Sequence, residues 1–298
     1  MFKLISVCLL EMLWCLSDLI IKPRVIPYEK GFRRETLCKS FDLDYYKRLP
    51  KKVFTIQSDF GYELSCELVE AVDNRDKKLA ILCHGLGCAK YTSIKYMELF
   101  YKLGFTVLMY DHRNHGLSGR AHTSMGYYEK YDLKKVVDWC INSYGEDIKL
   151  VTHGESMGGS TVLLHLAIDD RVKCAIADCA YSDLQQLIRH QLKQFYHLPC
   201  FCIPVVSFLT YLRAGFWYKE ASPIKVIADV ETPVLFIHGK IDNFVPSYMS
   251  RDMYEHKKKN KAIFLVAKAR HAQSYCRNKE EYKRRVEHFL NRYMKKPH

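Results

Sequence analysis

The stretch VTHGESMGGS, residues 151–160, places Ser156 between Gly154 and Gly158, directly after a run typical of a β-strand. A serine in a G-x-S-x-G pattern can sit on a strained turn between a strand and a helix, with its hydroxyl exposed at the carboxyl edge of a sheet. Small residues also gather at ordinary tight turns. The motif therefore predicts a nucleophile only if the rest of the chain supplies a base, an orienting carboxylate and donors for an oxyanion.

The chain around this motif alternates short apolar runs with amphipathic segments. The run LAILC at 79–83 lacks polar alternation, which is typical of a strand covered on both faces. Strand-like and helical patterns then follow in turn, and this predicts an α/β fold with a mostly parallel sheet and helices on both faces. An antiparallel hairpin is expected at 52–57 and 62–71, later strands at 105–111, 148–154, 172–180, 233–239 and 262–268, and helices at 95–104, 129–145, 157–168, 247–256 and from 279 on.

Two later strand ends carry the residues that a nucleophilic serine requires. Asp242 lies in FIHGKIDNFVP, a few residues after the strand 233–239, and His271 lies in LVAKARHAQSY, just after the next strand. We expect His271 to take the proton of Ser156 and return it to the leaving group, and Asp242 to fix the tautomer of His271 and stabilise its cation. The alternatives are a helix cap for Asp242 and an ordinary loop histidine for His271.

The turn LCHGLGCAK follows the strand 79–83 and has the H-G-x-G pattern of an oxyanion turn. We expect one backbone N–H donor from Leu86 and a second from Met157, which directly follows the nucleophile. Both assignments rest on backbone position alone.

Other reactive residues have weaker patterns. His112 and His115 have H-x-x-H spacing but lie in a turn without further ligands, so a metal site is not expected. Cys88 lies near the oxyanion turn, but no base is predicted beside it. His153 and His238 adjoin motif glycines and are expected to pack or to form hydrogen bonds.

Composition limits the class of protein. The 298 residues carry a net charge of +13, but the basic residues are dispersed and no nucleic-acid-binding motif accompanies them, so we expect no nucleic acid partner. A solvated basic surface is the simpler interpretation, and attraction to anionic membranes or acidic ligands is the alternative. Of the twelve cysteines, several lie inside apolar runs, as Cys83, Cys174 and Cys179 do, which favours a reducing, cytoplasmic location.

The N-terminal residues 1–21 are apolar but contain Glu11 and Asp18. On a helix, their polar side chains gather in one sector, which favours an amphipathic helix at a membrane surface or a helix packed on the protein over a membrane-spanning segment. Residues 22–50 are polar and basic and are expected to form an irregular connector. The remaining residues, 51–298, form the predicted catalytic domain.

Residues 182–222 interrupt the alternation with about forty mostly helix-forming, aromatic-rich residues, which predicts an inserted helical cap. Its apolar side chains could line a substrate site or could pack the cap onto the body. Its cations, Arg189, Lys193, Arg213 and Lys219, could receive an anionic group or could be solvated. The apolar candidates are Leu198, Phe201, Ile203, Val205, Phe208, Leu209, Phe216 and Trp217.

Six motifs within roughly residues 50–295 have a recognisable pattern: YDHRNHGLSG, SMGYYEKYDL, GESMGGST, ASPI, FIHGKIDNFVP and ARHAQS. Together they resemble the α/β-hydrolase superfamily, and within it the bacterial serine aminopeptidase-like and cinnamoyl-esterase-like hydrolases. It implies an eight-stranded sheet, a reaction without a cofactor, and a triad of Ser156, Asp242 and His271. Many such relatives have an apolar N-terminal anchor, from which Glu11 and Asp18 depart.

The expected function is therefore that of a serine hydrolase that cleaves a carboxylic ester with an apolar acyl or aromatic group through an acyl-enzyme. A peptidase or amidase and a thioesterase of the same fold are the alternatives. A membrane-associated binding protein without turnover is the alternative from another class. The oligomeric state is left open.

Overall fold

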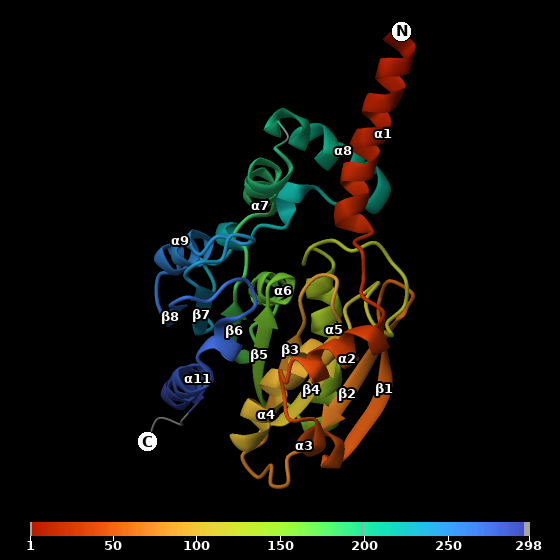
Figure 1. The fold of residues 1–298 in the computed structure, drawn as a ribbon. Helices are drawn as coiled ribbons and strands as arrows, with labels where there is room; N and C mark the ends of the chain where they lie inside the picture. Colours follow the sequence, from red (N-terminus) through yellow and green to blue (C-terminus); the bar gives the residue numbers. More distant parts are fainter. Residues whose placement is uncertain (1, 198, 295–298) are drawn as a thin grey trace.

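Eight strands form one sheet in the computed structural model, which describes residues 2–197 and 199–294 (Figure 1). The strand order is β1-β2-β4-β3-β5-β6-β7-β8, and β2 pairs antiparallel with both of its neighbours while β3 to β8 pair in parallel. The hairpin and the mostly parallel eight-stranded sheet are thus confirmed. The strands are β1 Lys51–Gln57, β2 Glu63–Val69, β3 Lys78–Cys83, β4 Thr106–Tyr110, β5 Lys149–Glu155, β6 Val172–Asp178, β7 Val234–Gly239 and β8 Lys261–Val266.

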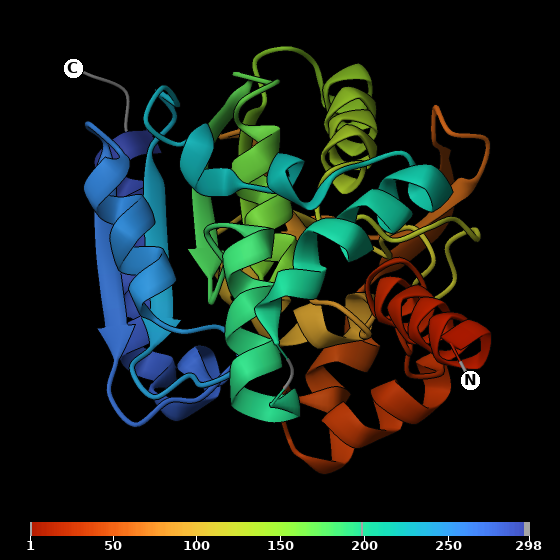
Figure 2. The same cartoon turned by 90° about the horizontal axis from the view of Figure 1, so that it is seen from above.

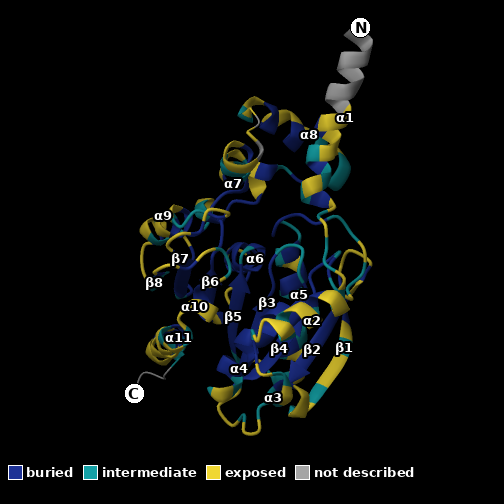
Figure 3. Cartoon of the chain, in the orientation of Figure 1, coloured by how far each residue is buried: buried dark blue, intermediate teal, exposed yellow. Residues whose placement is uncertain are grey.

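Helices cover both faces of the sheet, as predicted. One apolar core joins the sheet to α5 (Glu129–Tyr144), α6 (Met157–His165) and α9 (Tyr248–His256). The other core joins its opposite face to α4 (Ile94–Lys102) and α11 (Lys279–Met294). Because both faces are covered, β3 and β4 are buried almost throughout, which explains their unbroken apolar runs (Figure 3). Short helical segments are η1 Lys90–Ser93, η5 Pro223–Lys225 and α10 Ser274–Arg277.

We expected residues 22–50 to be irregular, and this prediction is wrong. The segment contains two helices, α2 (Tyr28–Leu37) and α3 (Leu43–Arg48). Their aromatic side chains pack on the sheet's second core: Phe32 lies 5.9 Å from Phe41 between ring centres. The Asp42 carboxylate accepts a hydrogen bond from the Tyr45 N–H at 2.9 Å and caps α3. The polar composition hid these elements, because few apolar residues are needed to hold a short helix that has a cap and an aromatic anchor.

The inserted segment lies over the carboxyl edge of the sheet (Figures 1 and 2). It comprises α7 (Leu184–Gln191), η2 (Leu192–Tyr196), η3 (Cys200–Cys202), α8 (Ile203–Ala214) and η4 (Tyr218–Glu220). A third apolar cluster joins these elements to the body and to α1 (Phe2–Ile21), whose carboxyl-terminal half packs beside α8. Residues far apart in the sequence therefore meet above the end of β5.

Across residues 2–197 and 199–294, no helix has both the length and the apolarity that crossing a bilayer demands.

Candidate active site

Ser156 occupies a sharp turn between β5 and α6 with φ 57° and ψ −119°, a backbone conformation that L-residues rarely adopt. The flanking glycines permit this turn. A Cβ on Gly154 would lie 2.2 Å from the carbonyl oxygen of Gly158, and one on Gly158 would lie 2.3 Å from the carbonyl oxygen of Cys83. The G-x-S-x-G spacing is thus required by close packing of α6 against β5 and β3.

The structure brings the three predicted residues together from three strand ends. The Ser156 hydroxyl lies 2.9 Å from His271 Nε2, and His271 Nδ1 lies 2.7 Å from Asp242 Oδ2. With the proton on Nδ1, His271 donates to Asp242 and its Nε2 accepts from the serine. This arrangement can remove the serine proton as the hydroxyl attacks.

Asp242 is held ionised by its surroundings. Burial alone would raise the pKa of this carboxyl group, but hydrogen bonds from His238 and His271 and from the Val245 N–H hold the pKa well below its usual range. Asp242 Oδ1, the oxygen not bonded to His271, accepts hydrogen bonds from the N–H groups of Phe244 and Val245 at 2.9 Å each. His238 also contacts Ser250 and the Val245 carbonyl oxygen, which confirms the hydrogen-bonding role predicted for it.

The predicted oxyanion turn lies against Ser156. A Cβ on Gly85 would be 3.4 Å from the Cβ of Ser156, and the next residue, Leu86, lines the same cavity as Ser156 and Met157. Met157 begins α6, so its N–H lies at the positive end of that helix. The two residues predicted to supply donors thus line the same cavity as Ser156.

Two histidines hold this turn in place: His84, which belongs to the H-G-x-G pattern itself, and His115, which sequence reasoning did not connect to the turn. The Gly87 N–H donates to His115 Nε2 at 3.0 Å, and the His84 ring donates to the Gly85 carbonyl oxygen at 2.8 Å while accepting the His112 N–H at 2.9 Å. Burial lowers the pKa of both His84 and His115. The rings therefore remain neutral, which leaves one nitrogen of each free to accept.

A buried group of charged residues lies beside the turn at Ser156, and the sequence analysis did not predict it. Lys95 forms a buried ion pair with Glu155, the residue before the nucleophile, and the Tyr96 hydroxyl donates to the same carboxylate at 2.6 Å. The Asp178 carbonyl oxygen accepts the Ser156 N–H at 2.8 Å. Burial and the nearby Glu155 raise the pKa of the Asp178 carboxyl group to about 6. These contacts fix the backbone on both sides of Ser156.

The other reactive residues considered in the sequence analysis are buried or packed against protein atoms. His153 is buried and contacts the Tyr282 hydroxyl at 2.8 Å, as expected of a packing residue. His112 is buried, and burial lowers its pKa to about 3. Burial raises the pKa of the Cys88 thiol to about 11, which keeps it protonated. Among the described residues, the one group of three potential metal ligands is Cys179, Asp242 and His271, and two of these belong to the triad.

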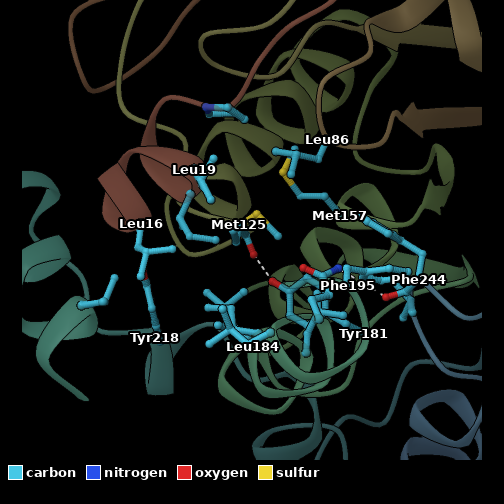
Figure 4. Close-up of a pocket in the computed structure, with 18 of the residues that line it drawn as sticks. Leu16, Leu19, Leu86, Met125, Met157, Tyr181, Leu184, Phe195, Tyr218 and Phe244 are labelled. Atoms are coloured by element: carbon cyan, nitrogen blue, oxygen red, sulfur yellow. Dashed lines mark hydrogen bonds between the residues drawn. The ribbon is translucent and has the colours of Figure 1, made fainter. Parts of the chain in front are cut away.

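Ser156 lies on a cavity of about 510 Å³ between the body and the cap, a size suited to a small organic ligand (Figure 4). The body contributes Leu86, Met125, Met157, Tyr181 and Phe244. The cap contributes mainly α7 and η2, through Leu184, Leu187, Ile188, Leu192 and Phe195, together with Ile203 and Val206 of α8. No Asp or Glu occurs among the described residues that line it.

The apolar cap residues predicted from the sequence as a possible substrate lining differ in their surroundings. Ile203 lines the cavity, but Phe216 is fully buried against Tyr127, with ring centres 5.7 Å apart, and serves to join cap to body. Trp217 stacks on Tyr211. Phe201, Val205 and Phe208 are exposed, Leu209 is partly buried in the third cluster, and Leu198 lies outside the described residues.

The predicted cap cations also separate. Arg213 forms an ion pair with Asp18 of α1, whereas Arg189 and Lys193 are exposed and the Lys219 ammonium lies 5.5 Å from the centre of the Trp217 ring. None of the four lines the cavity.

The N-terminal helix contributes to the cavity, which the sequence did not indicate. Leu16, Leu19 and Ile20 of α1 line it, followed by Pro23 and Arg24. In the view of Figure 4, Leu16 and Leu19 lie across the cavity from Met157 and Phe244. The spacing of 16, 19 and 20 could have shown a helical face, but not what it faces.

Comparison with known proteins places the fold of this chain in a known superfamily. A family model described as the alpha/beta hydrolase fold matches residues 79–199. The uncharacterized protein YqkD of Bacillus subtilis is 37% identical over 266 residues, which cover 88% of this chain and 87% of that protein. An uncharacterized membrane protein of Saccharomyces cerevisiae is 27% identical over 64% of this chain and 63% of its own length.

Among solved structures, an esterase of Pyrococcus furiosus superimposes with a TM-score of 0.72 and 25% identity, covering 92% of this chain and 97% of that one. The chain belongs to the α/β-hydrolase superfamily. Its fold and its esterase-like neighbours support a hydrolase.

The strained turn at Ser156 gives a testable consequence for stability. Replacing Ser156 by glycine removes strain of about 1–3 kcal/mol, whereas the greater freedom of glycine in the unfolded chain offsets about 0.4–1 kcal/mol. We expect Ser156→Gly to be about 1 kcal/mol more stable than Ser156→Ala in urea unfolding, because alanine keeps the strain. A Ser156→Gly variant that is less stable than Ser156→Ala by about 0.4–1 kcal/mol would show that the turn is unstrained.

Proposed function

We propose that this protein is a serine hydrolase that cleaves carboxylic esters with an apolar acyl or aromatic group. The observation that carries the proposal is the single hydrogen-bonded line from Ser156 through His271 to Asp242, at the base of an apolar cavity. Similarity to the Pyrococcus furiosus esterase supports the ester over other acyl substrates.

The proposed reaction proceeds in two halves. His271 Nε2 takes the proton of Ser156 as Oγ attacks the ester carbonyl, and the Leu86 and Met157 N–H groups hold the oxyanion. His271 then passes the proton to the leaving alcohol as the ester C–O bond breaks, which leaves an acyl group on Ser156. Water attacks the carbonyl of this acyl-enzyme with His271 again as base. The bond between the acyl carbon and Ser156 Oγ then breaks, His271 returns the proton to Oγ, and the acid is released. Asp242 stabilises the imidazolium in both halves.

The lining of the cavity favours an ester over a peptide. A peptidase that trims amino termini needs an acceptor for an ammonium group, and the described lining residues include no carboxylate. The lining is mostly aliphatic and aromatic, and burying apolar surface there would stabilise an acyl chain by about 25 cal/mol per Å².

We predict that the purified protein hydrolyses p-nitrophenyl octanoate with a higher kcat/KM than any aminoacyl p-nitroanilide or thioester of matched chain length. Ser156→Ala should lower the ester rate by at least about 10³-fold, because the nucleophile is lost. A fluorophosphonate probe should label the wild-type protein and not this variant. Faster anilide cleavage would instead identify a peptidase, and absence of Ser156-dependent labelling of folded protein a binding protein.

We further propose that the end of the molecule formed by α1 and α8 contacts a lipid surface. α8 and the preceding η3 expose Phe201, Val205, Phe208 and Leu212, which recur at intervals of three and four residues on one side; Phe201 is 81% and Leu212 62% exposed. Such a stripe on a surface helix is suited to the interfacial region of a bilayer. Arg189 and Lys193 of the neighbouring α7 and η2 are exposed and would favour anionic lipids. One relative, the yeast protein, is described as a membrane protein.

We predict that the protein sediments with vesicles of phosphatidylcholine and phosphatidylglycerol, and less with phosphatidylcholine alone. The double variant Phe201→Asp/Phe208→Asp should reduce the bound fraction at least about fivefold, because two apolar side chains no longer enter the lipid. Val72→Asp is the matched control, since Val72 is 93% exposed in the β2–β3 turn, at the other edge of the sheet. Equal binding of all three proteins would contradict this surface.

A further inference from the structure

The carboxyl-terminal half of α1 has one side that is packed into the protein. Leu13, Ser17 and Ile21, spaced by four residues, are all buried, and this spacing puts them on one side of the helix. The Ser17 hydroxyl lies 3.0 Å from the Thr210 hydroxyl of α8, which donates at 3.0 Å to the Tyr218 hydroxyl. Tyr218 lines the cavity, so this side of α1 is bonded to the cavity wall.

An ion pair also joins α1 to α8. The Arg213 guanidinium pairs with the Asp18 carboxylate, donates to the Trp14 carbonyl oxygen at 3.0 Å and lies 3.8 Å from the centre of the Trp14 ring. Planar guanidinium groups favour such combined contacts. Ser17 and Asp18, two of the polar residues of α1, thus contact the cap helix α8.

The chain that leaves α1 is bonded to the oxyanion turn. The Ile26 N–H donates to the Gly87 carbonyl oxygen at 2.9 Å, and the Ile21 carbonyl oxygen accepts the Thr123 N–H at 3.0 Å. α1 is therefore held at both of its contacts, at the cap and beside the catalytic turn. It is a fixed wall of the site in this structure.

A second side of α1 faces the cavity. Leu16, Leu19 and Ile20 line the same space as Ser156, and Leu19 remains 52% exposed although it is apolar. If this side existed only to pack α1 onto the protein, its leucine would be covered by protein atoms. An apolar wall that is left uncovered inside a cavity is suited to contact with an apolar ligand.

We propose that this side of α1 is the acyl-chain subsite, and that it selects the length of the acyl group which Ser156 accepts. The inference rests on the ester hydrolysis proposed above. A short acyl group bound at Ser156 contacts the body of the protein, whereas a longer one extends to Leu16, Leu19 and Ile20. Each methylene buried there would raise kcat/KM by roughly three- to fourfold.

Substitutions on the two sides of α1 test this subsite. Leu16→Trp and Ile20→Trp fill the cavity, whereas Cys15→Trp places the same side chain at an exposed position next to Leu16. The measurement is kcat/KM for p-nitrophenyl acetate, octanoate and dodecanoate. We expect the ratio of dodecanoate to acetate to fall at least about tenfold in Leu16→Trp and Ile20→Trp, because the volume for the chain end is lost. Cys15→Trp should keep the wild-type ratio.

An unchanged ratio in folded Leu16→Trp, or an equal loss for all three esters, would overturn the subsite. If the tryptophan variants do not fold, Leu16→Ala gives the opposite test. It enlarges the cavity and should shift the preferred ester toward hexadecanoate, and no shift would contradict the proposal.

Binding separates this inference from the proposed reaction. In the Ser156→Ala protein, dodecanoate should displace a fluorescent fatty acid in competition, and Leu16→Trp should weaken that competition at least about tenfold. If the wild-type protein hydrolyses no ester but this competition holds, the reaction is wrong and the subsite stands. If esters are hydrolysed but α1 variants change neither binding nor chain-length preference, the subsite is wrong.

Discussion

The site depends on the close approach of α6 to the ends of β5 and β3. Any side chain on Gly158 would collide with the backbone of β3, and the backbone of Ser156 must adopt an unfavourable conformation to turn into the helix. That geometry places the Ser156 hydroxyl at the carboxyl edge of the sheet, where the loops after β7 and β8 deliver Asp242 and His271. The predicted oxyanion turn after β3 lies beside it for the same reason. The parallel sheet thus brings Ser156 and His271, which are over a hundred residues apart in the sequence, within hydrogen-bonding distance.

Much of this arrangement could be predicted from the sequence, because it depends on local patterns. Unbroken apolar runs mark the buried strands, and carboxyl ends of neighbouring parallel strands meet at one edge. Ser156, Asp242 and His271 each follow such a run, so their meeting was predictable. The contacts that hold the backbone around these residues could not be predicted. Glu155 needs Lys95, and the oxyanion turn needs His115, and nothing in the spacing of these residues pairs one with the other.

The cap and α1 were harder to predict, for a physical reason. A helix that is polar on one side can face water, lipid or another polar helix, and the sequence pattern is the same in each case. In α1, Ser17 and Asp18 contact Thr210 and Arg213, so these two polar residues face another helix, whereas Glu11 is exposed. In α8 the reverse occurs, since Phe208 points outward while Phe216, in the loop that follows, joins the cap to the body. Hydrophobicity marked which residues avoid water, but not which surface covers them.

Trapping the acyl-enzyme tests the central claim, that Ser156 attacks an ester carbonyl, most directly. The protein is mixed with p-nitrophenyl octanoate, quenched in acid within milliseconds, digested and analysed by mass spectrometry. An octanoyl group on the peptide that carries Ser156, formed in a burst with p-nitrophenol and absent from Ser156→Ala, is the predicted result. Ester turnover with no acyl group on that peptide, or with the acyl group on another residue such as Cys88, would contradict the account.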